Sequence, residues 1–264
     1  MSRGNSVVAR QKLLYSCGAV LVFSGAVHVF VWLTLGGNWE GSVSWRKPIL
    51  FGISTGLTVL STAWLYPKLR PWKWDFYLCG LFGFAMVSEV ALISLQQWRG
   101  VASHFNNATP MDTLIESWMT YLIIIATLVL MEFTRRCFSS LDAPRDLRLA
   151  IQGGMAFLIV SCLIGFLILI YGNSQAAIGA DPTTFGRAGV TKFPHGVAIH
   201  AIQLFPLTCW LLLRIGVPEQ QRWRLTACLI AITAMFLLYS LAQTLSGKDR
   251  FDLPFSGMLL LISL

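Results

Sequence analysis

The four histidines, His28, His104, His195 and His200, are the residues of this chain best suited to chemistry. Imidazole titrates near neutral pH and is a common metal ligand. Histidine is also rare at membrane depth, where its charged form is costly. When the apolar segments are laid out as membrane spans, all four histidines fall in the same half of the membrane. This arrangement predicts a functional site in the outer leaflet.

Two carboxylates lie at nearly the same level. Glu89 is about eight residues below the outer end of the third predicted span, between apolar neighbours, so it must be protonated, paired or bound to a metal. Glu116 lies about one turn inside the fourth span, where the helix dipole also favours a carboxylate. With Arg99 at the membrane boundary, these residues are our candidate catalytic groups. The alternatives are structural pairing for Glu89, a dipole-favoured first-turn position for Glu116 and interfacial snorkelling for Arg99.

The sixth predicted span is expected to line the site. His200 and Gln203 are three residues apart and share one face of a helix, and Pro206 permits a kink just below them. His28 and His200 lie at similar depths, roughly 6 to 10 Å inside the boundary at 1.5 Å per residue. Four further polar residues of the outer half are candidate substrate-binding groups: Lys47, Gln203, Gln243 and Arg250.

Our first hypothesis is a metal-dependent membrane enzyme that acts on a lipid-like or quinone-like substrate. Zinc or iron would be bound by some of His28, His104, His195 and His200, because neutral imidazole and carboxylate suit these metals. The spacing of the last two argues against a simple pair, since residues five apart point about 140° apart on a helix. They would converge only if His195 lay in the loop before the helix begins.

Two alternatives stay open. The first is a b-type cytochrome in which His28 and His200 are the axial ligands of a haem, although the inner half has no histidine for a second haem. The second is a proton-coupled transporter or sensor with Glu89 as the protonatable group. The inner half offers mainly Ser and Thr residues of the kind used in helix packing, which favours a one-sided site over a path across the membrane.

The elements that position these residues are seven apolar segments. The chain is 55% hydrophobic and 12% charged, a composition typical of a multi-pass membrane protein. Because about 20 residues of helix cross about 30 Å of hydrocarbon, we predict an all-α bundle in one transmembrane domain, 1–264. The predicted spans are 13–35, 48–66, 76–97, 112–134, 149–171, 196–214 and 225–246. The stretch 257–264 is too short to cross and is expected to form a short interfacial or re-entrant end.

Charge gives the orientation. The N-terminus and the second, fourth and sixth loops carry 13 Lys and Arg residues and the opposite side carries 7, so we expect a cytoplasmic N-terminus. This bias also explains the net charge of +8 without a nucleic acid partner. The expected partners are membrane lipids, contacted by the basic, Trp-rich inner rim, and a small amphipathic substrate. We expect a bacterial inner membrane protein with its functional face outward, and no structural disulfide, since no cysteine lies in an outer loop.

Overall fold

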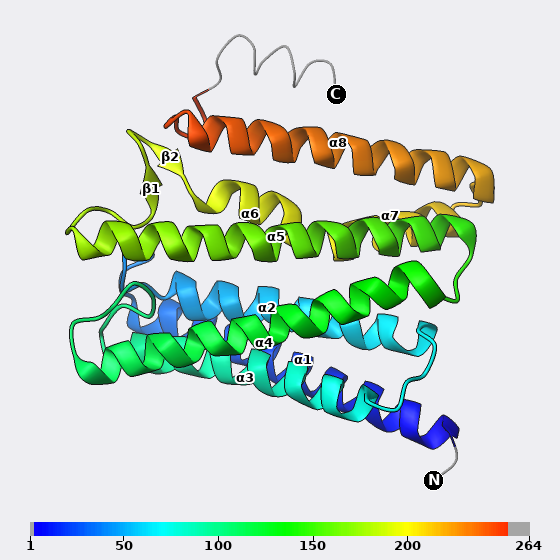
Figure 1. The fold of residues 1–264 in the computed structure, drawn as a ribbon, viewed down its shortest axis with the longest axis horizontal. Coiled ribbons are helices and arrows are strands. Elements are labelled where there is room, and N and C mark those ends of the chain that lie inside the picture. Colours follow the sequence, from blue (N-terminus) through cyan, green and yellow to red (C-terminus); the bar gives the residue numbers. More distant parts are fainter. Residues whose placement is uncertain (1–2, 253–264) are drawn as a thin grey trace. The chain divides into compact units, whose positions relative to one another are not determined.

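The computed structural model of this chain describes residues 3–252, which are almost entirely helical (Figure 1). Seven helical stretches are long and apolar enough to cross a membrane: Ser6–Leu35, Arg46–Lys68, Asp75–Trp98, Pro110–Ser140, Arg145–Ala177, Lys192–Arg214 and Glu219–Leu245. They confirm the predicted all-α membrane bundle, and the chain is an integral multi-pass membrane protein. The predicted C-terminal segment, 257–264, lies outside the described residues.

Contacts within the chain divide it into two compact units, Met1–Asp142 and Ala143–Leu264, called here unit 1 and unit 2. Unit 1 contains α1 (Arg3–Leu35), α2 (Arg46–Leu65), the 3-10 turn η1 (Tyr66–Lys68), α3 (Asp75–Trp98) and α4 (Pro110–Ser140). α3 packs against α1, α2 and α4, so it is the central helix of unit 1. That the whole chain forms one domain stays a prediction.

The helices of unit 1 extend beyond the predicted spans at their polar ends. The fourth span was expected to end at residue 134, but α4 continues to Ser140 and therefore includes Arg135 and Arg136. Hydropathy marks only the part of a helix that lies in hydrocarbon, whereas backbone hydrogen bonds continue into the polar boundary. The two arginines therefore stand on a helix rather than in a loop.

Glycines bring α1 and α2 into direct backbone contact. A Cβ atom at Gly52 would lie 2.8 Å from the Cα and the N of Gly25, and a Cβ at Gly56 would lie 2.9 Å from the N of Val22. In membranes, helices associate through close van der Waals packing of this kind because lipid tails remove the usual hydrophobic driving force. The α1–α2 pair therefore depends on these positions having no side chain.

Unit 2 contains α5 (Arg145–Ala177), a hairpin of β1 (Thr184–Phe185) and β2 (Gly189–Val190), α6 (Lys192–Ile199), α7 (Ala201–Arg214) and α8 (Glu219–Leu245). The α5–α6 connection is fixed locally, since the Tyr171 hydroxyl donates to the Thr184 carbonyl at 2.8 Å. In the same loop, hydrogen bonds from the Thr184 hydroxyl and the Thr183 N–H lower the pKa of Asp181.

The sixth span is two helices instead of one. α6 ends and α7 begins at His200, whose φ and ψ of −96° and 7° interrupt the helical geometry. Pro206 lies inside α7, six residues after the break, and the kink expected there stays a prediction. His195 lies within α6 rather than in the preceding loop, so the arrangement required for His195 and His200 to converge is not present.

We predict that Gly52→Ala destabilises the protein, because the added methyl group meets the backbone of Gly25, which cannot move away as a side chain can. Overpacking of this kind costs about 1–3 kcal/mol. Gly80→Ala is the matched control, since a Cβ there meets nothing within 4 Å. Thermal unfolding of both variants in detergent should give a lower Tm for the first alone, and equal Tm values would show that α1 and α2 are not in close contact.

Candidate functional site

Glu89 is the one charged residue of α3 between Asp75 and Gln96. It lies on the buried face of the helix with Met86, Val90 and Ile93, and only 5% of its surface is exposed. Its Oε2 is buried and has no hydrogen-bond partner among the described residues. A carboxylate oxygen left without a donor in such surroundings carries a large desolvation cost, so this position favours a protonated carboxyl or a bound cation.

One end of unit 1, called here the Trp98 end, is held by a carboxylate that was not among the candidates. Asp112 accepts hydrogen bonds from Arg99 at 2.8 Å and from Gln96 at 3.1 Å, so it ties α4 to the end of α3. Thr109 caps α4 by accepting the Asp112 N–H at 3.2 Å, and its hydroxyl donates to Oδ2 of Asp112 at 2.7 Å. The guanidinium of Arg99, a predicted catalytic group, is thus engaged in joining two helices.

Glu116 holds the loop between α3 and α4. Its two carboxylate oxygens accept the N–H groups of Phe105, at 3.0 Å, and of Asn106, at 2.7 Å. Phe105 has φ of +58°, a left-handed conformation that turns two successive N–H groups toward one anion. Such a conformation is costly for an aromatic residue, so the carboxylate stabilises a backbone that would otherwise relax. The catalytic role predicted for Glu116 stays a prediction.

His28 is buried at the Trp98 end, with both ring nitrogens in hydrogen bonds. Nε2 lies 3.2 Å from the indole N–H of Trp98, and Nδ1 lies 2.7 Å from the carbonyl of Ser24. An indole N–H only donates and a carbonyl only accepts, so His28 is neutral with its proton on Nδ1. The rings of Trp45 and Trp98 lie 6.0 and 6.4 Å from the imidazole centroid.

The other two candidates of unit 1 also have polar partners. His104 Nδ1 lies 2.9 Å from the hydroxyl of Ser103, and its ring lies 5.5 Å from that of Phe51. Lys47 donates to the carbonyl of Ser42 at 2.6 Å. The structure thus gathers Arg99, His104 and Glu116 in and beside the α3–α4 loop, close to the end of α3.

In unit 2, the histidines have different surroundings. The ring of His195 packs on α5, where Nδ1 lies 2.9 Å from the hydroxyl and 2.9 Å from the carbonyl of Ser161. Nδ1 of His200, at the break between α6 and α7, lies 3.4 Å from Oε1 of Gln203, so these two side chains lie side by side. His195 therefore reads as a helix-packing residue and His200 as the residue at a helix break.

Gln243 and Arg250 order the end of α8 and the segment after it. Gln243 donates to the carbonyl oxygens of Asp249, at 2.8 Å, and of Asp252. The guanidinium of Arg250 lies 4.8 Å from the ring centroid of Phe251. These contacts fold the segment back on the helix, so Gln243 has a local structural role, and substrate binding by either residue stays a prediction.

No group of three or more His, Cys, Asp or Glu side chains within residues 3–252 is placed so that it could hold a metal ion. For the haem hypothesis, an axial bond from His28 would require Nε2 to leave Trp98 or Nδ1 to leave Ser24. The roles in metal and haem binding proposed for His28, His104, His195 and His200 gain no support from the geometry of either unit.

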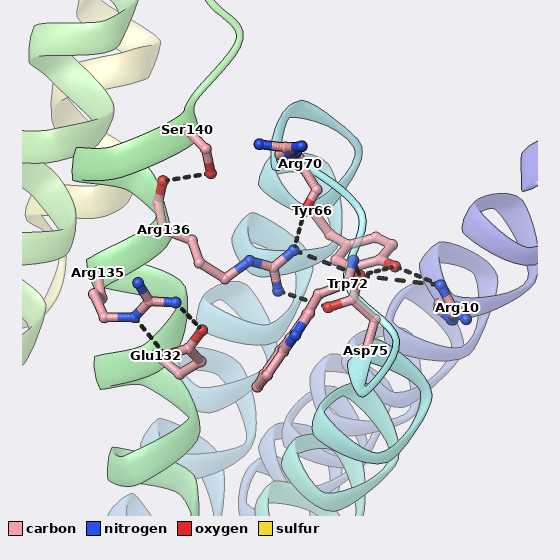
Figure 2. Close-up of polar contacts among 9 residues, drawn as sticks. All are labelled: Arg10, Tyr66, Arg70, Trp72, Asp75, Glu132, Arg135, Arg136 and Ser140. Atoms are coloured by element: carbon pink, nitrogen blue, oxygen red, sulfur yellow. Dashed lines mark hydrogen bonds and ion pairs between the residues drawn. The ribbon is translucent and has the colours of Figure 1, made fainter.

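The opposite end of unit 1, called here the Asp75 end, holds a buried ion-pair network (Figure 2). Oδ1 of Asp75 accepts from Arg136 at 2.6 Å, and Oδ2 accepts from the Tyr66 hydroxyl at 3.0 Å. The second terminal nitrogen of Arg136 donates to the carbonyl of Arg70 at 2.6 Å, and Arg10 reaches the Tyr66 hydroxyl at 3.2 Å. Residues from α1, η1, α3 and α4 thus meet at one fully buried carboxylate.

A buried aspartate paired with an arginine also joins helices of unit 2. Asp146, in the first turn of α5, accepts from Arg222 of α8 and, at 3.3 Å, from the thiol of Cys209 in α7. Arg222 also donates to the carbonyl of Val217 at 2.6 Å. One buried aspartate therefore joins three helices of unit 2, as Asp75 joins the helices of unit 1.

Sequence reasoning missed these networks for a definable reason. It treated Arg136 and Arg222 as loop residues that set the topology, although each lies on a helix and pairs with a buried aspartate. The sequence did contain a signal for these networks. Asp75 and Asp146 each lie in the first turn of a span, where a carboxylate needs a partner once the helix end packs against its neighbours. Asp112 gave the same signal.

Comparison of the chain with protein-family models, with curated proteins and with solved structures finds no match.

We predict that Arg136→Met strongly destabilises the protein, because it leaves the carboxylate of Asp75 buried without its main partner. Removing one member of a buried pair costs about 3–5 kcal/mol. Arg135→Met is the matched control, since that neighbouring arginine pairs with Glu132 on an exposed surface. Unfolding in detergent should separate the two variants, and a small effect of Arg136→Met would show that the network does not hold unit 1 together.

Proposed function

We propose that this protein is a proton-coupled membrane transporter and that Glu89 is the group that carries the proton. The observation that carries the proposal is the buried Oε2 of Glu89, which lacks a hydrogen-bond partner among the described residues. An ionisable residue inside a span that is not neutralised by a partner is the usual mark of an ion or proton site.

The position of Glu89 supports a site inside the hydrocarbon. It lies about 21 Å along α3 from Asp75 and about 10 Å from Gln96, at 1.5 Å per residue. These two residues belong to the polar networks at the two ends of unit 1, so α3 crosses about 32 Å between them, close to the thickness of the hydrocarbon. A carboxyl at this depth is beyond the reach of interfacial water unless a path opens.

The surroundings of Glu89 favour access from the Trp98 end. Toward the Asp75 end, α3 buries Cys79, Phe82 and Met86, and the ring of Phe82 packs edge-on against Phe133 at 6.4 Å. Toward the Trp98 end, the polar network that begins at Gln96 is about 10 Å away along the helix, against about 21 Å to Asp75. The shorter way from the carboxyl to a polar boundary thus leads to the Trp98 end.

The broken sixth span supports transport over a fixed structural role. Interrupted helices at membrane depth are common in transporters, because freed backbone groups at the break can contact a solute or an ion. The break between α6 and α7 falls at His200, a residue with a polar side chain.

We further propose that the Trp98 end faces outward and that the protein resides in a bacterial inner membrane. Basic residues near the Asp75 end of unit 1 lie over aromatic rings, with Lys68 at 4.7 Å from Trp64 and Lys73 at 5.4 Å from Trp74. Such pairs are typical of the membrane interface, and the excess of Lys and Arg on this side is typical of the cytoplasmic face. Proton uptake through the Trp98 end would then occur from outside.

This orientation predicts the labelling of two exposed positions. In a variant without the six native cysteines, Asn107→Cys should react with an impermeant maleimide added to intact cells, and Asp142→Cys should react only after permeabilisation. Asn107 lies in the loop beside the Trp98 end, and Asp142 follows α4 at the Asp75 end. The reverse pattern would place proton uptake on the cytoplasmic side.

The proton itself is the probe that tests Glu89. A pH titration of the purified full chain in lipid nanodiscs, followed by infrared difference spectroscopy, should show the stretch of a protonated carboxyl that disappears in Glu89→Gln. Glu132→Gln is the matched control, since Glu132 lies in a span but pairs with Arg135 at 2.8 Å, and it should keep the band. Proton-driven currents in proteoliposomes, screened with amino acids, sugars and organic acids, should likewise be lost only in Glu89→Gln.

Two results would contradict this proposal. A carboxyl band that survives in Glu89→Gln would assign the proton to another residue. Stoichiometric zinc, iron or haem in the same purified sample, found by elemental analysis and the visible absorption spectrum, would instead favour the metal-dependent enzyme or the b-type cytochrome.

A further inference from the structure

The second and sixth spans match in length and in the residues at their ends. Both are 23 residues long, Arg46–Lys68 and Lys192–Arg214, and both begin and end with a basic residue. The final basic residue of each lies over the ring of a tryptophan four positions earlier, at 4.7 Å for Trp64 and 4.9 Å for Trp210. Each residue of the second span therefore has a counterpart at the same place in the sixth.

α3 and α8 end in the same way. Each is followed by a glycine with positive φ, Gly100 at +72° and Gly247 at +65°. The residue after that glycine donates its N–H to a glutamine carbonyl, at 3.1 Å for Gln96 and 3.2 Å for Gln243. A glycine C-cap is common, but the cap does not require a glutamine, and both glutamine side chains are buried. The ends of the two helices thus correspond residue by residue.

α1 and α5 contact these spans at corresponding levels. On α1, a Cβ at Gly25 would lie 3.1 Å from the carbonyl oxygen of Ile49. On α5, the hydroxyl of Ser161 donates to the carbonyl of His195 at 3.0 Å. Ile49 and His195 hold the same place, the fourth, in the second and sixth spans. The first helix of each unit therefore packs on the same part of the next span.

A close contact between α1 and α3 recurs between α5 and α8 with the partners exchanged. In unit 1, a Cβ at Gly83 of α3 would lie 2.9 Å from the sulfur of Cys17 on α1. In unit 2 the glycine is on the first helix: a Cβ at Gly153 of α5 would lie 2.7 Å from the side chain of Ile230 on α8. The small residue has changed sides, and the close contact is kept.

The buried ion pairs show the same exchange. Unit 1 pairs Arg10 of α1 with Asp75 of α3 at 4.0 Å, and unit 2 pairs Asp146 of α5 with Arg222 of α8. In both units, the ion pair and the glycine contact are seven residues apart on the first helix and eight apart on the last. Because two contacts at fixed spacing determine how two helices cross, α1 crosses α3 as α5 crosses α8.

We propose that α1 to α3 and α5 to α8 are two copies of one three-helix unit and that α4 is the helix that connects them. A copy of three spans ends on the side of the membrane opposite to its start. A fourth span is therefore needed before the second copy can begin on the same side as the first. Many transporters are built from repeats of this kind, detectable as weak internal symmetry. The duplication agrees with the proposed function but does not rest on it.

The two copies differ at the residues to which the proposed function assigns a role. Fourteen residues after the ion pair, α3 has Glu89 where α8 has Phe236. The ninth residue of the second span is Ser54, within the continuous α2, and the ninth of the sixth span is His200, at the helix break. The proton site, which rests on the proposed function, then belongs to the first copy and the helix break to the second.

The equivalence of the copies is tested by two distances. In the full chain without its six native cysteines, spin labels at Lys12 and Tyr77 measure the distance from α1 to α3, and labels at Arg148 and Arg224 measure that from α5 to α8. Each label is two residues after a member of the ion pair. Pulsed electron paramagnetic resonance in nanodiscs should give equal distances within the width of the label distribution. Moving the last label one turn, to Gln220, shifts it about 6 Å along α8 and should remove the equality.

Unequal distances for the two corresponding pairs would overturn the proposal. The same positions also test the direction of the copies. In intact cells, single cysteines at Lys12 and Arg148 should both be protected from an impermeant maleimide or both be labelled by it. Labelling of one alone would place the starts of the two copies on opposite sides of the membrane and would also overturn the proposal.

The exchanged contact offers a second test. Gly153→Cys should lower the Tm, because the added side chain meets Ile230. Adding Ile230→Gly gives the second copy the cysteine and glycine of the first, so the double variant should regain most of the lost Tm. Gly154→Cys is the matched control, since a Cβ there lies 2.7 Å from the Cα of Ile202, a contact that Ile230→Gly cannot relieve. Equal losses of Tm in Gly153→Cys with and without Ile230→Gly would contradict the equivalence of the two contacts.

Neither test involves proton binding, so the two proposals can fail separately. Equal distances together with a Glu89 that does not titrate in the infrared experiment would retain the duplication and refute the transport function. Unequal distances together with a titrating Glu89 would do the reverse.

Discussion

Hydrocarbon offers no hydrogen bonds, and this constraint explains most of the polar chemistry of the protein. Hydroxyl groups within the helices return to the carbonyl one turn earlier, as Thr62 does with Thr58 at 2.9 Å and Thr134 with Leu130 at 2.7 Å. Buried charges are paired, and the aspartates of the first helical turns each find an arginine. Because most buried polar groups have a partner, those without one among the described residues are informative.

The paired charges also fix how helices lie against one another. In unit 1, α3 and α4 are joined near one end by Asp112 with Gln96 and Arg99, and near the other by Asp75 with Arg136. Two fixed points about a hydrocarbon thickness apart leave these helices no freedom to slide, since a shift of one residue would separate both sets of partners. A buried ion pair adds little net stability compared with apolar packing, but it specifies a single alignment. The helix between the two points can therefore hold Glu89 at a defined depth.

The fold could be predicted from the sequence because a membrane span is a local property. About 20 apolar residues suffice to recognise one, whatever the rest of the chain does. The break at His200 was not predicted, since no proline stands at that position to mark it. The partners of the candidate residues were equally hidden. Asp75 and Arg136 are 61 residues apart, and only tertiary structure pairs them.

The candidate residues also differ in how much of their role depends on tertiary partners that the sequence does not reveal. Glu116 and Gln243 are polar residues that bind backbone groups of a nearby loop, a role that residue type and depth do not distinguish from catalysis. Glu89 differs because a carboxyl at its depth must be protonated, paired or bound to a metal, and the described residues supply no partner to Oε2. His28 is intermediate: both of its nitrogens are satisfied, but only while it is neutral. His28 and Glu89 lie on adjoining helices of unit 1, and Glu89 is the deeper of the two.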